Sequence, residues 1–188
     1  MRDIIILPGI GNSGETHWQS HWERANPGLR RFQPSDWDRP NLADWIAALD
    51  SAVASADEPP LLVAHSLACL LVAHWQKASV LPVAGAFLVA VPDPASPAFP
   101  AEAAGFAAVP AEPFHFPSLV VASSNDPFGS VGYAQMRAAQ WGSGLVEVGA
   151  LGHINGRSGL GDWSEGRTLF RSFVAGAAHE SASLAVNG

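Results

Sequence analysis

The feature that most constrains this chain is a short apolar run followed at once by a serine and a second apolar stretch. Residues 61–65 read Leu-Leu-Val-Ala-His, Ser66 follows, and a stretch with helical character continues to about residue 78. The first run is typical of a buried strand and the second of a helix. A sharp strand-to-helix turn lifts a serine out of the sheet. The pattern therefore predicts an α/β sheet with a candidate nucleophile at one edge.

Apolar β-branched runs alternate with helical patterns along the whole chain. The runs lie at 4–7, 61–64, 84–91, 118–122 and 145–148, with a weaker one near 29–33. Helices are expected at about 14–25, 42–53, 66–78, 130–141 and 162–174. Such alternation indicates a mostly parallel sheet of about six strands with helices on both faces. At 188 residues we expect one α/β-hydrolase-like domain without a lid domain.

Helix starts can be predicted from capping patterns. Asn41 with Asp44 predicts one start, and Asp162 with Glu165 predicts the start of a C-terminal helix. Asn12 with Glu15 predicts a helix that begins at Gly14. The domain is expected to cover 1–178, followed by a frayed tail over 179–188.

Two further polar motifs follow apolar runs in the order that a serine hydrolase needs. Ser-Ser-Asn-Asp-Pro occupies 123–127 and Gly-His-Ile-Asn occupies 152–155. A serine hydroxyl becomes a good nucleophile when a base takes its proton and a third group orients that base. Ser66, Asp126 and His153 are therefore a candidate triad. Asp93, which follows the run at 84–91, is a rival for the acid, and chain order favours Asp126.

Several motifs together resemble one family over roughly residues 3–175. They are Leu-Pro-Gly-Ile-Gly-Asn-Ser-Gly at 7–14, Gln-Pro-Ser-Asp-Trp at 33–37, Ala-His-Ser-Leu at 64–67, Ser-Asn-Asp-Pro at 124–127 and Gly-His-Ile-Asn at 152–155. The chain resembles the small lidless serine hydrolases related to retinoblastoma-binding protein nine. The resemblance implies Ser66 as nucleophile, Asp126 as orienting acid and His153 as base. The chain departs from the usual pattern at Ala64 and Ala68, where glycine is more common.

The family name suggests a pocket-protein motif, Leu-x-Cys-x-Glu. The nearest match is Leu67-Ala-Cys69-Leu-Leu71, which lacks the glutamate. We therefore predict no such protein partner.

An acyl-transfer site also needs N–H groups directed at the developing oxyanion. One usually belongs to the residue after the nucleophile and one to the loop after the first parallel strand. Leu67 and Ile10 occupy those positions. His65, Trp18 and Trp37 are candidates to line the substrate site, although core packing is the better interpretation of both tryptophans.

No cofactor or metal is implied by the sequence. His17 and His21 have a spacing that can hold a metal, but no acidic residue lies between them and no cysteine or carboxylate cluster completes a site. The 17 acidic and 10 basic residues give a net charge of −7, so nucleic acid and membrane are not expected partners. A lone cysteine, Cys69, and the lack of a signal-like start indicate a cytoplasmic protein.

The sequence thus predicts a serine hydrolase that cleaves a small ester or activated amide through an acyl-enzyme. A binding protein on a hydrolase scaffold with little or no catalysis is the alternative. The proline-rich stretch 92–117 is either a surface connection or part of the site, with at most a short helix near 99–106. Because it is too small for a lid domain, the serine is expected to be open to solvent.

Overall fold

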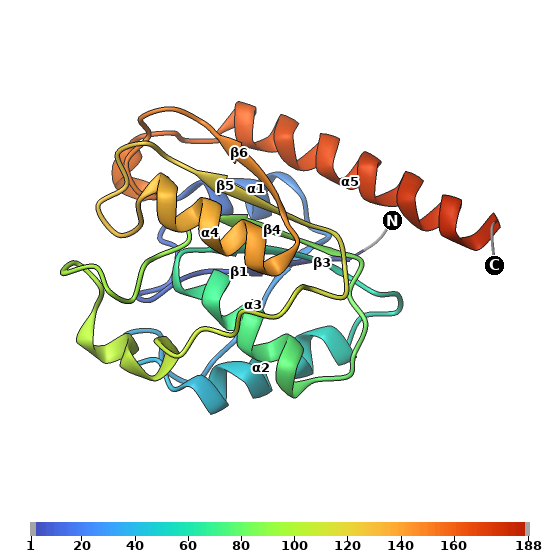
Figure 1. Cartoon of the computed structure of the whole chain (residues 1–188), viewed down its shortest axis with the longest axis horizontal. Coiled ribbons are helices and arrows are strands. Elements are labelled where there is room, and N and C mark those ends of the chain that lie inside the picture. The colour runs from blue at the N-terminus through green and yellow to red at the C-terminus, as the bar shows by residue number, and fades with distance from the viewer. Residues whose placement is uncertain (1–2, 187–188) are drawn as a thin grey trace.

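Six parallel strands form a single sheet in the computed structural model, which describes residues 3–186 and the side chains of residues 3–177 (Figure 1). The strands are β1 (Ile4–Leu7), β2 (Leu29–Arg31), β3 (Leu61–His65), β4 (Gly85–Val89), β5 (Ser118–Ala122) and β6 (Gly144–Glu147). Their order across the sheet is β2-β1-β3-β4-β5-β6, and every neighbouring pair is parallel. The predicted α/β-hydrolase fold of one domain is confirmed.

Helices cover both faces of this sheet (Figure 1). They are α1 (Trp18–Ala25), α2 (Leu42–Ala54), α3 (Leu67–Ala78), α4 (Val131–Trp141) and α5 (Ser164–Val186), with 3-10 helices η1 (Ala101–Phe106) and η2 (Gly156–Ser158). Helices α2, α3 and α4 share one apolar core with one face of the sheet. Helices α1 and α5 share a second core with the other face. The inner strands β1, β3, β4 and β5 read as mainly apolar runs because both faces of the sheet are covered.

The central strands β3 and β4 are buried along their whole length. Their carboxyl ends, with those of β1, β5 and β6, lie at one edge of the sheet because all the strands are parallel. The loops after these strands therefore meet at that edge, which is where open α/β sheets bind ligands.

Two predicted helix starts are wrong and one is confirmed. The Asn41 side chain caps α2 by accepting from Asp44 N at 3.1 Å. Helix α1 begins at Trp18 rather than Gly14, because Asn12 Oδ1 accepts from Arg31 and the His17 ring provides the cap. Helix α5 begins at Ser164, and the Asp162 carboxylate pairs with Arg167 instead of capping it. Residues 187–188 and the side chains of 178–186 lie outside the described part, so the frayed tail stays a prediction.

Candidate active site

Ser66 lies at the sharp turn between β3 and α3, in a backbone conformation that few residues other than glycine adopt. Its φ is 56° and its ψ is −125°. Ser66 N donates to Val89 O at 2.9 Å, and Ser66 O accepts from Cys69 N at 2.9 Å. Strain of this kind persists only where surrounding contacts impose it, and it is concentrated at functional sites.

Space for this turn comes from Gly9, in the loop after β1. A Cβ at position 9 would lie 2.9 Å from Ser66 Cβ and 3.3 Å from Leu67 N. The flanking residues Ala64 and Ala68 are fully buried. The two alanines are therefore compatible with the turn, because a glycine from another strand end provides the close approach.

The three residues of the candidate triad form a continuous chain of hydrogen bonds. Asp126 accepts from His153 Nδ1 at 2.8 and 2.9 Å, and His153 Nε2 lies 2.8 Å from Ser66 Oγ. A carboxylate only accepts, so Nδ1 carries the proton and Nε2 accepts from the serine hydroxyl. This tautomer is the one that a base needs in order to take a proton from Ser66.

The loop after β5, not the one after β4, provides the acid. The Asp126 side chain is 2% exposed and also accepts from Phe128 N at 2.9 Å. The Asp93 carboxylate accepts from Ala95 N at 2.8 Å within its own turn. The structure thus brings Asp126 to the histidine and leaves Asp93 outside the hydrogen-bond chain.

Residues around His153 hold its loop in place. His65 Nε2 donates to His153 O at 2.9 Å, and Trp18 Nε1 donates to Ile154 O at 2.8 Å. Asn125 Oδ1 accepts from Gly152 N at 2.7 Å. The backbone on both sides of the histidine is therefore tied to β3, α1 and the loop after β5.

Comparisons with known proteins show the family to which the chain belongs. Residues 4–172 match the family model described as serine hydrolase. The chain belongs to the serine hydrolase family. A YdeN-like hydrolase from Pectobacterium atrosepticum is 32% identical, with a TM-score of 0.83 over 94% of this chain and 92% of that one. The ydeN gene product from B. subtilis is 20% identical, with a TM-score of 0.74 over 93% and 100% of the two chains.

No curated protein matches this serine hydrolase. The finer relation to retinoblastoma-binding protein nine stays a prediction.

A cavity of about 600 Å³ opens above Ser66 in this serine hydrolase. Ser66 is 9% exposed at its floor. Pro92, Phe99, Pro100 and Ala103, all from the stretch 92–117, line it. The expectation of a serine open to solvent is therefore wrong, because this proline-rich stretch forms one wall of the site.

Of the three predicted lining residues, only His65 lines the cavity. Trp18 is 1% exposed and packs against Trp22 and Trp163 in the core beneath α1 and α5. Trp37 packs against Phe32 and Trp45 on the other face of the sheet. Core packing, the preferred interpretation of both tryptophans, is thus confirmed, and their alternative role as lining residues is wrong because both rings pack into the cores of the fold.

Two polar side chains that the sequence analysis missed hold the loop after β1. The Arg31 guanidinium donates to Asn12 Oδ1 at 2.7 Å and to Ser13 O at 2.9 Å. Gln19 Nε2 donates to Leu7 O and Val63 O at 3.2 and 3.1 Å, and its Oε1 accepts from Ser13 Oγ at 2.7 Å. Gln19 is fully buried and Arg31 is partly buried, and the sequence pattern marks neither position.

Two histidines beside the site are held neutral. Burial lowers the pKa of His17 to about 3, with the charge of Arg31 and the neighbouring ring of His153 as further causes. Burial also lowers the pKa of His65 well below its usual value, helped by its histidine neighbours. Their rings form an edge-to-face series with His153, with centroids 4.7 and 5.0 Å apart.

The described residues contain no group of three or more histidine, cysteine or carboxylate side chains that could hold a metal. His17 Nδ1 accepts from Gln19 N at 3.2 Å, so its ring caps α1.

Burial raises the pKa of the Cys69 thiol, which lies 3.3 Å from Val89 O. Within the described part, no helix is long and apolar enough to cross a membrane.

Proposed function

We propose that this chain hydrolyses small esters or activated amides through an acyl-enzyme on Ser66. The hydrogen-bond chain from Asp126 through His153 to Ser66 carries the proposal. Membership of the serine hydrolase family supports it. No cofactor is needed for this chemistry.

The steps follow from the positions of the protons. Ser66 Oγ attacks the substrate carbonyl carbon while His153 Nε2 takes the hydroxyl proton. When the tetrahedral intermediate collapses, the bond to the leaving group breaks and His153 gives that proton to the leaving oxygen or nitrogen. Water then attacks the acyl-enzyme by the same route, which releases the acid and restores Ser66. Asp126 orients His153 and stabilises its charged form.

Backbone N–H groups of Leu67 and Ile10 are the proposed oxyanion donors. Leu67 is the first residue of α3, so its N–H has no acceptor inside the helix. In the loop after β1, Gly11 N donates to Trp37 O and Asn12 N donates to Gly9 O. The N–H of Ile10 has no acceptor among the described residues, and both Ile10 and Leu67 line the cavity.

Labelling with a fluorophosphonate probe tests the nucleophile. The wild-type protein should gain one label on Ser66, and Ser66→Ala or His153→Ala should abolish labelling and hydrolysis of nitrophenyl butyrate. The double variant should be hardly slower than either single variant, because the triad acts as a unit.

The matched control is Ser124→Ala, which removes an exposed serine near Asp126. It should label like the wild type. Undiminished labelling of Ser66→Ala would refute the assignment. A folded wild-type protein that neither labels nor turns over any ester would instead favour the alternative of a binding protein on a hydrolase scaffold.

A further inference from the structure

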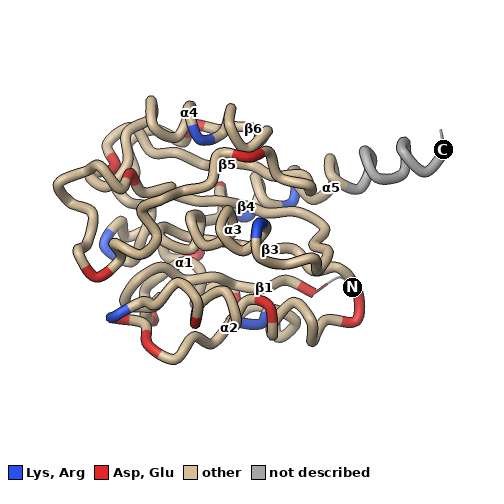
Figure 2. The backbone as a smooth tube through the Cα atoms, turned by 60° about the horizontal axis from the view of Figure 1, so that its bottom comes forward, with Lys and Arg blue, Asp and Glu red and all other residues tan. Residues whose placement is uncertain are grey.

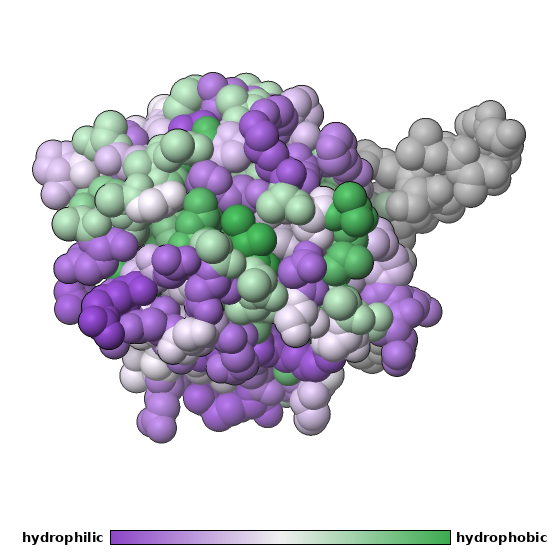
Figure 3. Space-filling view, turned by 90° about the horizontal axis from the view of Figure 1, so that it is seen from below, coloured by the Kyte–Doolittle hydropathy of each residue, from purple (hydrophilic) through white to green (hydrophobic). Residues whose placement is uncertain are grey.

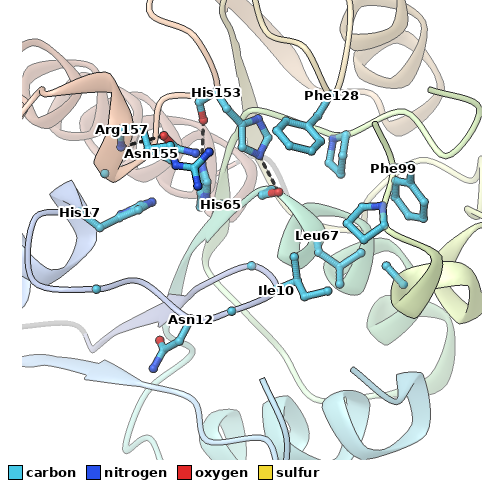
Figure 4. Close-up of a pocket in the computed structure, with 18 of the residues that line it drawn as sticks. Ile10, Asn12, His17, His65, Leu67, Phe99, Phe128, His153, Asn155 and Arg157 are labelled. Carbon is cyan, nitrogen blue, oxygen red and sulfur yellow. Dashed lines mark hydrogen bonds between the residues drawn. The ribbon is translucent and has the colours of Figure 1, made fainter. Parts of the chain in front are cut away.

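The cavity above Ser66 has two chemically different ends (Figure 4). Ile10, Leu67, Phe99 and Phe128 gather on one side of the Ser66–His153 pair. His17, Asn155 and Arg157 lie on the opposite side. An apolar end favours a hydrocarbon group, whereas a polar end favours a group that accepts hydrogen bonds or carries charge.

Arg157 gives the polar end its charge. Among the described residues that line the cavity, none is acidic and Arg157 is the one permanent cation. No described carboxylate lies within ion-pair distance of its guanidinium, although the chain carries a net charge of −7. Figure 2 shows that basic and acidic residues are both distributed over the whole backbone of the fold.

The backbone of Arg157 is held beside the catalytic histidine. Arg157 lies in η2, four residues after His153. Its N–H donates to Asn155 Oδ1 at 3.0 Å, and Asn155 N donates to Ser158 Oγ at 3.1 Å. This pair of bonds fixes the short helix, so the base of the arginine side chain has a defined position relative to His153.

The proposed mechanism determines which part of the substrate meets each end. The leaving group departs next to His153 Nε2, which must protonate it. Asn155 and Arg157 follow His153 in the same loop and line the same side of the cavity. The acyl group then extends past Ile10 and Leu67, the residues whose N–H groups hold the oxyanion, towards Phe99.

From this arrangement we propose that Arg157 is a specificity-determining residue that binds an anionic group, carboxylate or phosphate, on the leaving part of the substrate. The inference rests on the proposed function, because it uses the acyl-enzyme geometry. A guanidinium binds both anions through paired N–H donors. Since Arg157 is exposed, the preference should be modest.

Matched aryl butyrates test the proposal. The substrates are 4-(butyryloxy)benzoate, its methyl ester, the corresponding aryl phosphate, and the 4-trimethylammonio analogue. At low salt the wild type should hydrolyse the anionic esters about five- to tenfold better in kcat/KM than the neutral one, mainly through a lower KM. The preference should shrink as ionic strength rises. A preference for only one of the two anions identifies the group.

Substitutions assign the preference to this residue. Arg157→Gln should bring the anionic-to-neutral ratio to about one, Arg157→Lys should restore part of it, and Arg157→Glu should favour the cationic ester. Arg171→Gln is the control, because it removes an exposed arginine of α5 that does not line the cavity. Its ratio should equal that of the wild type.

Two failures can be told apart. Hydrolysis and labelling with the same ratio in wild type and Arg157→Gln would overturn the role of Arg157 and leave the proposed function standing. A protein that hydrolyses none of the four esters and does not react with fluorophosphonate would overturn both.

Discussion

The backbone conformation of Ser66 is held by its main-chain hydrogen bonds and by the space that Gly9 leaves beside it. Its φ of 56° is unfavourable for a serine, a conformation that costs about 1–3 kcal/mol. Three features stabilise this conformation. Ser66 N donates to Val89 O, Ser66 O accepts from Cys69 N, and Gly9 has no Cβ that would collide with Ser66. The hydroxyl is therefore directed at His153 before any substrate binds, which removes a reorganisation cost from the reaction.

The role of Asp126 can be tested by a substitution that keeps its shape. In Asp126→Asn the side-chain amide can donate to His153 Nδ1, which would place the ring proton on Nε2. Nε2 could then no longer accept the hydroxyl proton of Ser66. We expect kcat for nitrophenyl butyrate to fall by about 10⁴, as the orienting acid of a triad predicts. Steady-state kinetics at a single pH measures this.

Asp93→Asn is the matched control for that substitution. Asp93 accepts from Ala95 N in its own turn and has no bond to His153, so kcat should change less than threefold. A large loss at Asp93 with a small loss at Asp126 would move the acid to the loop after β4.

Helix α1 begins with a histidine whose ring is part of the fold. His17 Nδ1 accepts from Gln19 N, and burial lowers the pKa of His17 to about 3. His17 therefore stays neutral in the folded protein at pH values below about 6.5, where the same imidazole in the unfolded chain binds a proton. Stability from this site is present above pH 6.5 and is lost as the pH falls from there towards 3.

His17→Asn removes that pH dependence while keeping a side chain that caps helices well. Between pH 6.5 and 4.5 the free energy of unfolding of the wild type should fall by about 2 kcal/mol more than that of the variant. Urea unfolding at a series of pH values measures the difference. The control His115→Asn removes an exposed imidazole and should follow the wild type. Parallel curves for wild type and His17→Asn would contradict the prediction.

Strands were more predictable than helix starts for a physical reason. Strands β1, β3, β4 and β5 are mainly apolar runs because the sheet is covered on both faces, so their burial is visible in the local sequence. The start of α1 depends instead on a tertiary contact, since Arg31 from β2 binds the Asn12 side chain that would otherwise cap the helix. Likewise Asp162 pairs with Arg167. Capping patterns alone do not reveal such competition.

At the scale of the whole molecule, chain order predicted which residues meet but not what surrounds them. Ser66, Asp126 and His153 each follow a strand of one parallel sheet, so topology brings them to one edge. The cavity walls come from the loop after β1, the stretch 92–117 and η2. Arg157 and Phe99 carry no local motif, and their shared cavity is a property of the assembled fold.

The surface offers little for a lipid interface. On the face shown in Figure 3, hydrophobic and hydrophilic residues are interspersed. Among the described residues, the large hydrophobic side chains that are exposed are Val80 and Met136, which lie in different parts of the chain. Activity should therefore not rise when an ester substrate forms droplets or micelles.

The size of the apolar end predicts the acyl-chain preference. Each methylene buried against Phe99 and its neighbours should contribute up to about 0.8 kcal/mol, or roughly fourfold in kcat/KM. Because the cavity of about 600 Å³ is shared with the polar end, kcat/KM of nitrophenyl esters should rise from acetyl to butyryl or hexanoyl and then level off. Phe99→Ala should flatten that rise, whereas Phe116→Ala, which removes a half-buried ring that does not line the cavity, should not. A steady increase through octanoyl to palmitoyl would mean that the apolar end continues into a long acyl channel, and the wall formed by the stretch 92–117 would then have to move aside when substrate binds.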